Sequence, residues 1–268
     1  MKKRWILFVA AVALAVWVLW GNRAVQVNAW TVESSEIPDA FDGFRIAQIS
    51  DLHNAEFGQG NERLLERLMC AEPDIIVFTG DLIDSTNTRV DIALDFAAKA
   101  VKIAPCYYVS GNHESRTGQW QALRQGLLAA GVRVLEDEAA MLERDGESVV
   151  IAGLRDPDFG GDFYGALGSV TAGEGYTILL SHRPERMDAY AACGADLVFS
   201  GHAHGGQFRI PFVGGVVAPH QGWFPEFDSG LFYLGDTVML VSRGLGNSII
   251  PLRINNRPEI ILAVLKAS

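Results

Sequence analysis

The sequence predicts an α/β fold whose first half is built on parallel strands. Three times between residues 44 and 130, an apolar run of β-forming residues leads into a polar turn and then into a stretch with helical spacing. Strands that alternate with helices in this way form parallel sheets. The 268 residues are 49% hydrophobic and 20% charged, which is enough apolar material for one well-filled domain.

The expected elements follow in order along the chain. In the first half, strands are expected at 44–50, 74–79 and 106–110, and helices at 61–71, 90–103 and 120–130. The second half is more β-like, with strands expected at 149–152, 176–180, 197–199, 239–241 and 260–264. No helix is expected between the last two of these strands.

The N-terminal segment predicts a membrane anchor. Residues 5–22 carry no charge, and as a helix they would span about 27 Å, close to the thickness of the hydrocarbon core of a bilayer. The preceding cluster of Lys2, Lys3 and Arg4 predicts that this end stays in the cytoplasm, with the rest of the chain outside the cell membrane. A cleaved signal peptide is the alternative, since residues 27–29 weakly resemble a cleavage site. The length and the tryptophans of the run favour an uncleaved, single-pass anchor.

Residues 23–43 are expected to be a linker, and residues 44–268 one folded domain. The net charge is -10, and beyond the basic N-terminal cluster 19 basic side chains face 32 acidic ones, a balance of -13. This balance disfavours nucleic acid as a partner, because a basic surface usually binds the phosphate backbone. The three cysteines, Cys70, Cys106 and Cys193, are far apart, which argues against both a disulfide framework and a thiolate metal site.

Histidines gather at the ends of the expected strands. Five of the six follow a strand beside Asp, Asn or Gly, namely His53, His113, His182, His202 and His204. The carboxyl ends of strands are where open α/β sheets bind their ligands. A single histidine in a turn is more often a surface residue than a ligand, but five of six at strand ends are poorly explained in that way.

Oxygen donors accompany these histidines at Asp51, Asp81 and Asn112. A set of imidazole, carboxylate and amide groups without cysteine suits Mn, Fe, Zn or Co. Seven or eight ligands are too many for one such ion. We therefore expect two metal ions about 3.5–4 Å apart, bridged by a carboxylate.

Five blocks in this region resemble the calcineurin-like metallophosphoesterase superfamily. In chain order they are Asp51-x-His53, Gly80-Asp81-x-x-Asp84, Gly111-Asn112-His113-Glu114, His182 and Gly201-His202-x-His204. Residues 205–207, 242–246 and 257–259 are similar to the membrane-associated bacterial phosphodiesterase branch. The resemblance runs from about residue 44 to the C-terminus. It implies a four-layer α/β/β/α sandwich of two mixed sheets flanked by helices.

The resemblance also implies how the metals are held. It assigns Asp51, His53, Asp81 and His204 to the first metal, and Asp81, Asn112, His182 and His202 to the second. Asp81 would then be the bridging carboxylate, and Mn is the favoured metal.

Three neighbouring positions receive supporting or catalytic roles from the resemblance. His113 stands in the proton-donor position and Asp84 in the position that orients this histidine, although an N-cap or turn residue is the alternative for Asp84. Glu114 is expected to support the ligands without binding a metal. Purple acid phosphatases carry a tyrosine where this sequence has Asp84, so a ferric ion bound by tyrosinate is not expected.

Two further features carry weaker predictions. Arg243 follows an expected strand beside Gly-rich sequence, so we expect it to bind a substrate phosphate. Arg253 and Arg257 are alternatives, and surface pairing is the competing explanation for all three. Residues 208–227 are apolar and rich in Gly, Pro and aromatic residues, which is typical either of a loop packed over the core or of a membrane-facing, lipid-binding lip.

These patterns predict a membrane-anchored, dinuclear-metal phosphodiesterase that hydrolyses a phosphoric ester or pyrophosphate bond outside the cytoplasmic membrane. The anchor favours a lipid- or cell-wall-linked substrate. A phosphomonoesterase needs the same metal pair and is the alternative. A non-catalytic, metal-dependent scaffold is a third hypothesis, against which the pairing of His113 with Asp84 argues. Neither a nucleic acid nor a protein partner is expected.

Overall fold

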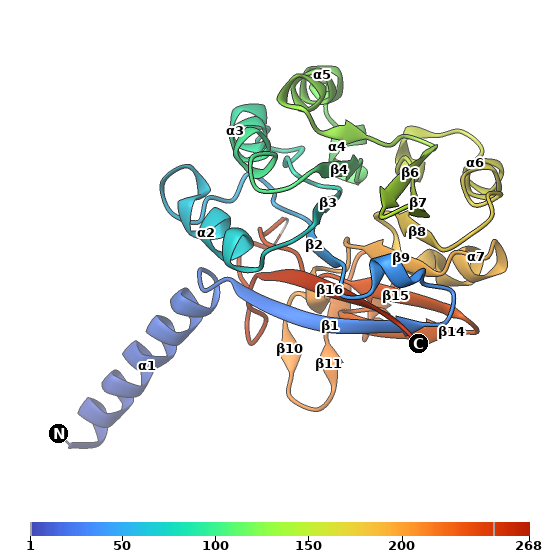
Figure 1. The fold of residues 1–268 in the computed structure, drawn as a ribbon. Helices are drawn as coiled ribbons and strands as arrows, with labels where there is room; N and C mark the ends of the chain where they lie inside the picture. Colours follow the sequence, from blue (N-terminus) through green and yellow to red (C-terminus); the bar gives the residue numbers. More distant parts are fainter. Residues whose placement is uncertain (1, 249) are drawn as a thin grey trace.

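The computed structural model describes residues 2–248 and 250–268 and has four layers (Figure 1). Two six-stranded sheets pack face to face through a shared apolar core, and helices cover the outer face of each sheet. Each sheet contains parallel and antiparallel pairs. The predicted fold class, a sandwich of two mixed sheets flanked by helices, is confirmed.

The first sheet holds the strands expected in the first half of the chain. Its order is β1 (Gln26–Ser34), β16 (Glu259–Ala267), β2 (Arg45–Ile49), β3 (Ile75–Thr79), β4 (Cys106–Val109) and β5 (Arg133–Val134). Strands β2 to β5 are parallel, while β16 runs antiparallel to β2 and parallel to β1. Its outer face is covered by α2 (Glu62–Cys70), α3 (Val90–Ala100) and α5 (Trp120–Ala130). All three helices lie close to their expected bounds.

The second sheet holds the later strands other than β16. Its order is β14 (Gly230–Leu234), β15 (Thr237–Val241), β9 (Leu197–Ser200), β8 (Thr177–Leu180), β7 (Glu147–Gly153) and β6 (Glu138–Arg144). Its outer face is covered by α6 (Phe163–Val170) and α7 (Met187–Ala192). These helices were not predicted, because eight and six residues are too short to display a clear helical period.

Alternate residues of β2 face the two sides of its sheet. Ile46 packs between the sheets, whereas Ala47 packs under the helices. Gln48 also lies between the sheets and is fully buried. Its amide donates to the Thr79 hydroxyl at 2.9 Å and to the Ser200 carbonyl at 2.8 Å. This polar bridge ties the two sheets together at the strand ends that carry the candidate site.

The segment expected as a linker, residues 23–43, instead adds a strand to the first sheet. Within it, β1 pairs in parallel with β16 along its whole length of nine residues. The expectation of a linker is therefore wrong for Gln26–Ser34. The strand lies at the sheet edge and buries only Val32 fully, so its sequence lacks the apolar run that marks the inner strands.

The N-terminal helix α1 (Lys2–Gly21) stands away from the body (Figure 1). Among the described residues it is the one helix long and apolar enough to cross a membrane, and none of it is buried. Its base is fixed by Asn22, which donates to the carbonyl of Arg253 and accepts from its N–H, both at 2.8 Å. The Arg257 guanidinium also lies 4.7 Å from the ring centroid of Trp20. The helix thus leaves the domain in a direction set by specific contacts.

Residues 208–227, here called the insert, form two small hairpins. The first pairs β10 (Arg209–Ile210) with β11 (Gly214–Gly215) and projects from the body (Figure 1). The second pairs β12 (Val217–Ala218) with β13 (Gly222–Trp223) and buries Ala218 against the second sheet. The insert therefore contacts the core through Ala218, while much of both hairpins is exposed, including Trp223 and Phe224 of the second.

Candidate metal centre

The seven predicted ligands follow strands β2, β3, β4, β8 and β9, with Asn112 at the start of the short helix α4 (Asn112–Ser115). They are Asp51, His53, Asp81, Asn112, His182, His202 and His204, and all are buried. Five of them, Asp51, His53, Asp81, His202 and His204, have φ angles between 45° and 65°. A left-handed backbone costs a non-glycine residue about 1–3 kcal/mol and persists where the surrounding structure requires it, as at functional sites.

Asp51, His53 and His204 form a first cluster, whose ligand atoms all lie within 4.8 Å of one another. Oδ1 of Asp51 is 3.8 Å from Nε2 of His53 and 3.5 Å from Nε2 of His204. Two ligands that each lie about 2.1 Å from one tetrahedral ion are about 3.4 Å apart. The spacing in this cluster therefore fits a shared divalent cation.

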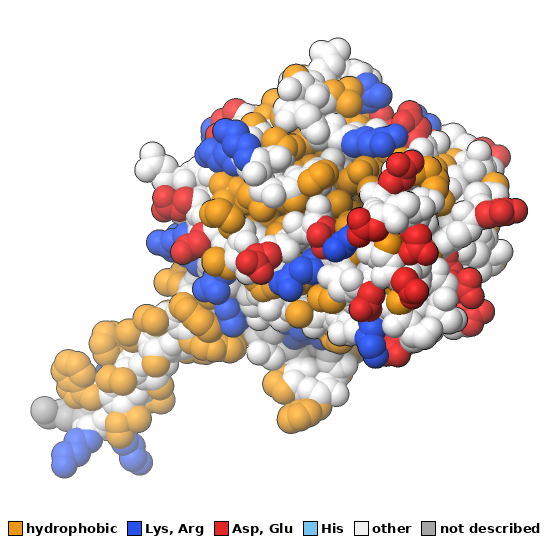
Figure 2. Space-filling view, viewed as in Figure 1, with side chains coloured by type: hydrophobic (Ala, Val, Ile, Leu, Met, Phe, Trp, Pro, Cys, Tyr) orange, Lys and Arg blue, Asp and Glu red, His pale blue; other side chains and the backbone are white. Residues whose placement is uncertain are grey.

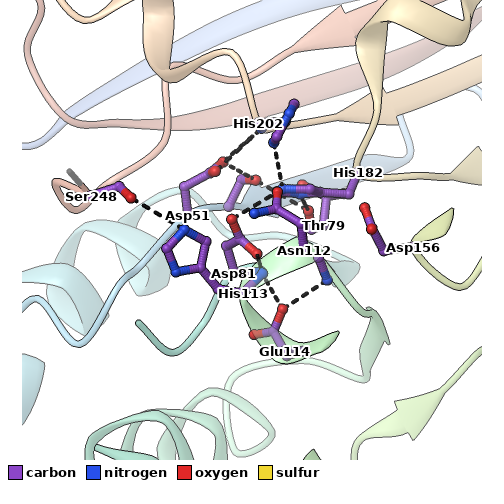
Figure 3. A network of polar contacts seen from close by, with 12 residues as sticks. Asp51, Thr79, Asp81, Asn112, His113, Glu114, Asp156, His182, His202 and Ser248 are labelled. Carbon is purple, nitrogen blue, oxygen red and sulfur yellow. Dashed lines mark hydrogen bonds and ion pairs between the residues drawn. The ribbon is translucent and has the colours of Figure 1, made fainter. Parts of the chain in front are cut away.

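Asp81, His182 and His202 form a second cluster beside the first (Figure 3). Nε2 of His182 lies 3.2 Å from Oδ2 of Asp81 and 3.2 Å from Nδ1 of His202. The same Asp81 oxygen is 3.6 Å from Nε2 of His53 in the first cluster. The carboxylate of Asp81 thus connects the two clusters.

Several buried polar atoms of the clusters have no hydrogen-bond partner among the described residues. They include Oδ2 of Asp81, both ring nitrogens of His53 and Oδ1 of Asn112. An unpaired buried polar atom costs about 1–3 kcal/mol, so natural proteins seldom leave several of them together. Two cations would satisfy these atoms. The residues therefore fit a dinuclear metal site.

Hydrogen bonds around the clusters orient the ligands. Nδ1–H of His182 donates to the Thr79 carbonyl at 2.7 Å, which leaves Nε2 free to bind a metal (Figure 3). The Glu114 carboxylate accepts from the backbone N–H of Asp81 at 2.9 Å and from that of Gly111 at 2.8 Å. Glu114 thus fixes the loop that carries Asp81.

Burial and the two carboxylates set the protonation of the metal-free ligands. Burial opposes charge on His53, but the nearby carboxylates of Asp51 and Asp84, at 3.8 and 3.5 Å, raise its pKa to about 9. Burial also opposes charge on His182, while Asp81 raises the pKa of this ring to about 10. Two imidazolium groups therefore offset the carboxylates when no metal is bound, and metal binding would displace their protons.

His113 lies beside the clusters. The backbone N–H of Ser85 can only donate, and it bonds to Nδ1 of His113 at 3.0 Å. The neutral ring therefore carries its proton on Nε2, which lies 3.2 Å from the Ser248 hydroxyl (Figure 3). Oδ2 of Asp84 is 3.7 Å from Nδ1 of His113 and 3.5 Å from Nδ1 of His53. Asp84 thus lies between two rings rather than bonding closely to His113 alone.

A cavity of about 300 Å³ opens over the clusters. Its lining residues are Asp81, Asn112, His113, Arg116, His202, His204, Gln207, 217–220 of the insert, Ser248 and Ile250. Metal-ligand candidates, the ring of His113 and the insert therefore meet in one space.

Residues 44–206 match the sequence pattern of calcineurin-like phosphoesterases. The chain belongs to the calcineurin-like phosphoesterase family. This metallophosphoesterase is 33% identical over 252 residues to the uncharacterized metallophosphoesterase YkuE of Bacillus subtilis, a match that covers 91% of this chain and 86% of YkuE. It is also 27% identical over 237 residues to the phosphodiesterase YaeI of Escherichia coli, covering 83% and 82% of the two chains.

A zebrafish relative and a solved structure extend the comparison. The zebrafish transmembrane protein with metallophosphoesterase domain is 29% identical over 278 residues, and the match covers 96% of this chain but 62% of the relative. This chain therefore spans less than two thirds of that protein. The crystal structure of TT1561 of Thermus thermophilus superposes with a TM-score of 0.52 at 12% identity, covering 75% of this chain and 90% of TT1561. That likeness concerns the fold alone.

Arg243 was expected to bind a substrate phosphate, but it does not line the cavity over the metal clusters of this metallophosphoesterase. It lines a separate cavity of about 260 Å³ at the base of α1, together with Arg253 and Arg257. Its backbone N–H donates to Glu259 at 2.7 Å, and its Nε lies 3.7 Å from the other oxygen of the same carboxylate. The cavity over the metal clusters is instead lined by Arg116, which closely follows the predicted block at 111–114.

Arg183 of the metallophosphoesterase was not predicted from the sequence. Its buried guanidinium bonds to both carboxylate oxygens of Asp156, at 2.6 and 2.9 Å. Nη1 of the same group lies 3.2 Å from Nε2 of His202 and 2.8 Å from Nδ1 of His220. The sequence feature that could have pointed to Arg183 is its position directly after His182.

His220 is the histidine that the sequence left outside the site. The insert brings its Nδ1 to 2.8 Å from Nε2 of His202. Nη1 of Arg183, which can only donate, lies 3.2 Å from the same Nε2, so His220 and Arg183 together hold the ring of His202 in place. His220 thereby orients a predicted metal ligand. Sequence spacing does not reveal this contact, because it depends on how the insert folds.

Proposed function

We propose that this metallophosphoesterase is a phosphodiesterase that needs two divalent cations, with Mn favoured among Mn, Fe, Zn and Co. The position of Asp81 Oδ2, 3.6 Å from His53 Nε2 and 3.2 Å from His182 Nε2, carries the proposal. A carboxylate within reach of both imidazole groups is what a bridged pair of ions requires. The relative YaeI, which is named a phosphodiesterase, supports the choice of a diester substrate.

The ligand sets follow from the two clusters. The first ion would be held by Asp51, His53, Asp81 and His204, and the second by Asp81, Asn112, His182 and His202. Metal ions held by these residues would supply an activated water for attack on phosphorus and positive charge that neutralises phosphate oxygens. The chain's own contribution is to hold each ligand in place. The Thr79 carbonyl does this for His182, and His220 does it for His202.

His113 is the proposed proton donor to the leaving oxygen. As an acid it must first carry a second proton on Nδ1, so the ring must give up the bond that it accepts from the Ser85 N–H at 3.0 Å and turn this proton toward Oδ2 of Asp84, 3.7 Å away, or Oγ of Ser85, 3.1 Å away. The Asp84 carboxylate would stabilise this charged ring. Burial lowers the pKa of free His113, and an anionic phosphate in the cavity would raise it again. The imidazolium then gives its Nε2 proton to the leaving oxygen and returns to the neutral state.

We also propose that α1 is a single-pass anchor and that the domain lies outside the cytoplasmic membrane. The basic residues Lys2, Lys3 and Arg4 precede the apolar helix, which is the orientation signal of a cytoplasmic end. The zebrafish relative, named a transmembrane protein, supports an anchored domain. The substrate would then be a phosphoester or pyrophosphate linked to a lipid or to the cell wall.

The test uses the full chain in detergent with Mn²⁺ added and compares substrates that carry different leaving groups. We expect hydrolysis of bis-p-nitrophenyl phosphate to exceed that of p-nitrophenyl phosphate and to stop when a chelator is added. His113→Ala should lower kcat by about 100-fold with glycerophosphocholine, whose leaving group is a poor alkoxide. The loss should be smaller with bis-p-nitrophenyl phosphate, because nitrophenolate leaves without protonation. Met141→Ala, at an exposed position on β6, is the matched control.

The outcomes separate the candidate functions. Faster hydrolysis of the monoester would make the protein a phosphatase. No hydrolysis of any of the three compounds, with two metal ions per chain measured by mass spectrometry, would favour the scaffold. An equal loss in His113→Ala for both leaving groups would remove the role of His113 as an acid.

A further inference from the structure

The first hairpin of the insert ends in an exposed apolar tip, formed by Ile210, Phe212 and Val213. Phe212 is completely exposed, and Val213 and Ile210 are 63% and 46% exposed. No charged residue occurs in 210–225, although charged residues make up 20% of the chain. Such a patch on a soluble surface is unfavourable, so a partner that accepts apolar side chains is indicated.

The apolar tip projects on the same side of the body as α1. Figure 1 shows the β10–β11 hairpin and α1 both leaving the body below β1 and β16. In Figure 2 the end of this projection and α1 are orange, while the acidic side chains in view lie on the body. Contacts of Asn22 and Trp20 fix the base of α1, so the fold sets the direction in which this helix leaves the body.

A strip of chain connects the base of α1 to the hairpin. Arg253 bonds to Asn22, and two residues later Asn255 donates its side-chain amide to the Arg209 carbonyl of β10 at 3.3 Å. Leu252 and Ile254 in this strip are 37% and 38% exposed. The strip thus continues the apolar surface between the helix and the tip.

Cationic and aromatic side chains lie where this strip meets α1. Arg243 and Arg257 line one cavity with Trp17 and Trp20, while Arg253 in its wall is buried and donates to backbone carbonyls. Arginine beside tryptophan at the end of an apolar helix is typical of the interface between lipid headgroups and acyl chains. The chain as a whole has a net charge of -10, so these arginines form a local positive region on an otherwise acidic protein. The chemistry of this face suits an anionic lipid surface.

We propose that the apolar tip inserts into the interface of the same bilayer that holds α1, as a second membrane contact. The inference rests on the proposed anchoring of α1. Residues 217–220 of the same insert line the cavity over the metal clusters. Contact of the tip with lipid therefore holds this cavity near the membrane surface. It favours phosphodiesters that are embedded in the bilayer over soluble ones.

Depth-dependent quenching tests the contact without using enzyme activity. Exposed Cys70 and partly exposed Cys193 are first replaced by serine, and an NBD fluorophore is attached to Val213→Cys in the full chain. Met141→Cys on exposed β6 is the matched control. In nanodiscs of phosphatidylcholine and phosphatidylglycerol that contain doxyl-labelled lipid, position 213 should be quenched at least about twofold more than position 141. Equal quenching at the two positions would overturn the proposal.

A second arm measures the consequence for turnover. The variant Ile210→Ser/Phe212→Ser/Val213→Ser should hydrolyse soluble bis-p-nitrophenyl phosphate at the unchanged rate. With hexadecyl p-nitrophenyl phosphate in nanodiscs it should lose about tenfold, because buried apolar area holds the tip on the bilayer. Phe212→Leu, which keeps an apolar side chain, should retain both rates.

The two arms separate this proposal from the proposed function. Quenching at position 213 without hydrolysis of either compound would support the membrane contact and refute the phosphodiesterase. Hydrolysis without quenching would do the reverse. A blue shift at position 213 without lipid quenching, together with a dimer in mass photometry, would assign the tip to a second copy of the chain and overturn the proposal.

Discussion

Oδ2 of Asp81 lies 3.2 Å from Nε2 of His182, while Oδ1 of the same carboxylate accepts the backbone N–H of His113 at 2.8 Å. One side chain therefore connects a proposed metal ligand, His182, to the backbone of the proposed proton donor, His113. A shift of Asp81 would disturb both. Asp81 therefore links the proposed metal ligands to the proposed proton donor, and the spacing of the sequence blocks does not reveal this link.

Asp81→Asn should remove most of the metal bound by the protein. The amide keeps the size of the side chain but loses its charge and one of the two acceptor oxygens. We expect fewer than two metal ions per chain by mass spectrometry and a loss of kcat of at least about 100-fold. Asp91→Asn, at an exposed position on α3, should change neither quantity. Two tightly held ions in the Asp81 variant would contradict the bridging role.

Metal affinity should rise with pH. In the metal-free protein the pKa of His53 is raised to about 9 and that of His182 to about 10, so both rings are protonated near neutral pH. A metal must displace these protons, and fewer of them remain to be displaced as the pH rises toward 9. Calorimetric titration with Mn²⁺ in buffers of different ionisation enthalpy should reveal proton release at pH 7. Affinity that stays constant between pH 6 and pH 9 would show that neither ring competes with the metal.

Gly111→Ala should weaken metal binding through a purely steric effect. The φ angle of Gly111 is -109°, which alanine adopts without strain. A methyl group there would overlap Oδ1 of Asp81 and lie 2.7 Å from its backbone nitrogen, so the bridging side chain must move. We expect a loss of Mn²⁺ affinity of about 10–100-fold with the fold intact by circular dichroism.

Gly118→Ala is the matched control, since a methyl group at that position meets nothing within 4 Å. It should leave the Mn²⁺ affinity unchanged. Equal affinities in the Gly111 and Gly118 variants would mean that the position of Asp81 is not critical for the site.

The inner strands and the candidate ligands were predictable because their signals are local. Asp51 and His53 follow an apolar run directly, and so does Asp81. Parallel strands bring their carboxyl ends to one edge, so residues at these ends meet whatever the exact strand order is. The clusters at Asp51 and Asp81 confirm this expectation of proximity.

The remaining parts depend on contacts that no local pattern encodes. Strand β1 is an exposed edge strand, so only its pairing with β16 identifies it. Arg243 follows a strand end like the ligands do, yet it lines the cavity at the base of α1 and not the cavity over the clusters. His220 reaches His202 through a Gly- and Pro-rich insert whose course the sequence does not specify. Long-range packing therefore decided these three cases.

The buried pair of Arg183 and Asp156 provides a last prediction, on stability. Both side chains are almost completely buried and joined by two hydrogen bonds, so Arg183→Met leaves the Asp156 carboxylate buried without its cation. Asp158, whose Oδ1 lies 2.8 Å from Nη2 of Arg183, still pairs with the guanidinium when Asp156 is replaced. Arg183→Met should therefore lower the free energy of unfolding by about 3–5 kcal/mol, and Asp156→Asn by less. The double variant should lose less than the sum of the two, because it leaves neither charge uncompensated. Urea unfolding of the full chain in detergent, followed by tryptophan fluorescence, measures all three variants. Additive losses would mean that the two residues stabilise the fold independently, and Arg183 would then act mainly through its contacts with His202 and His220.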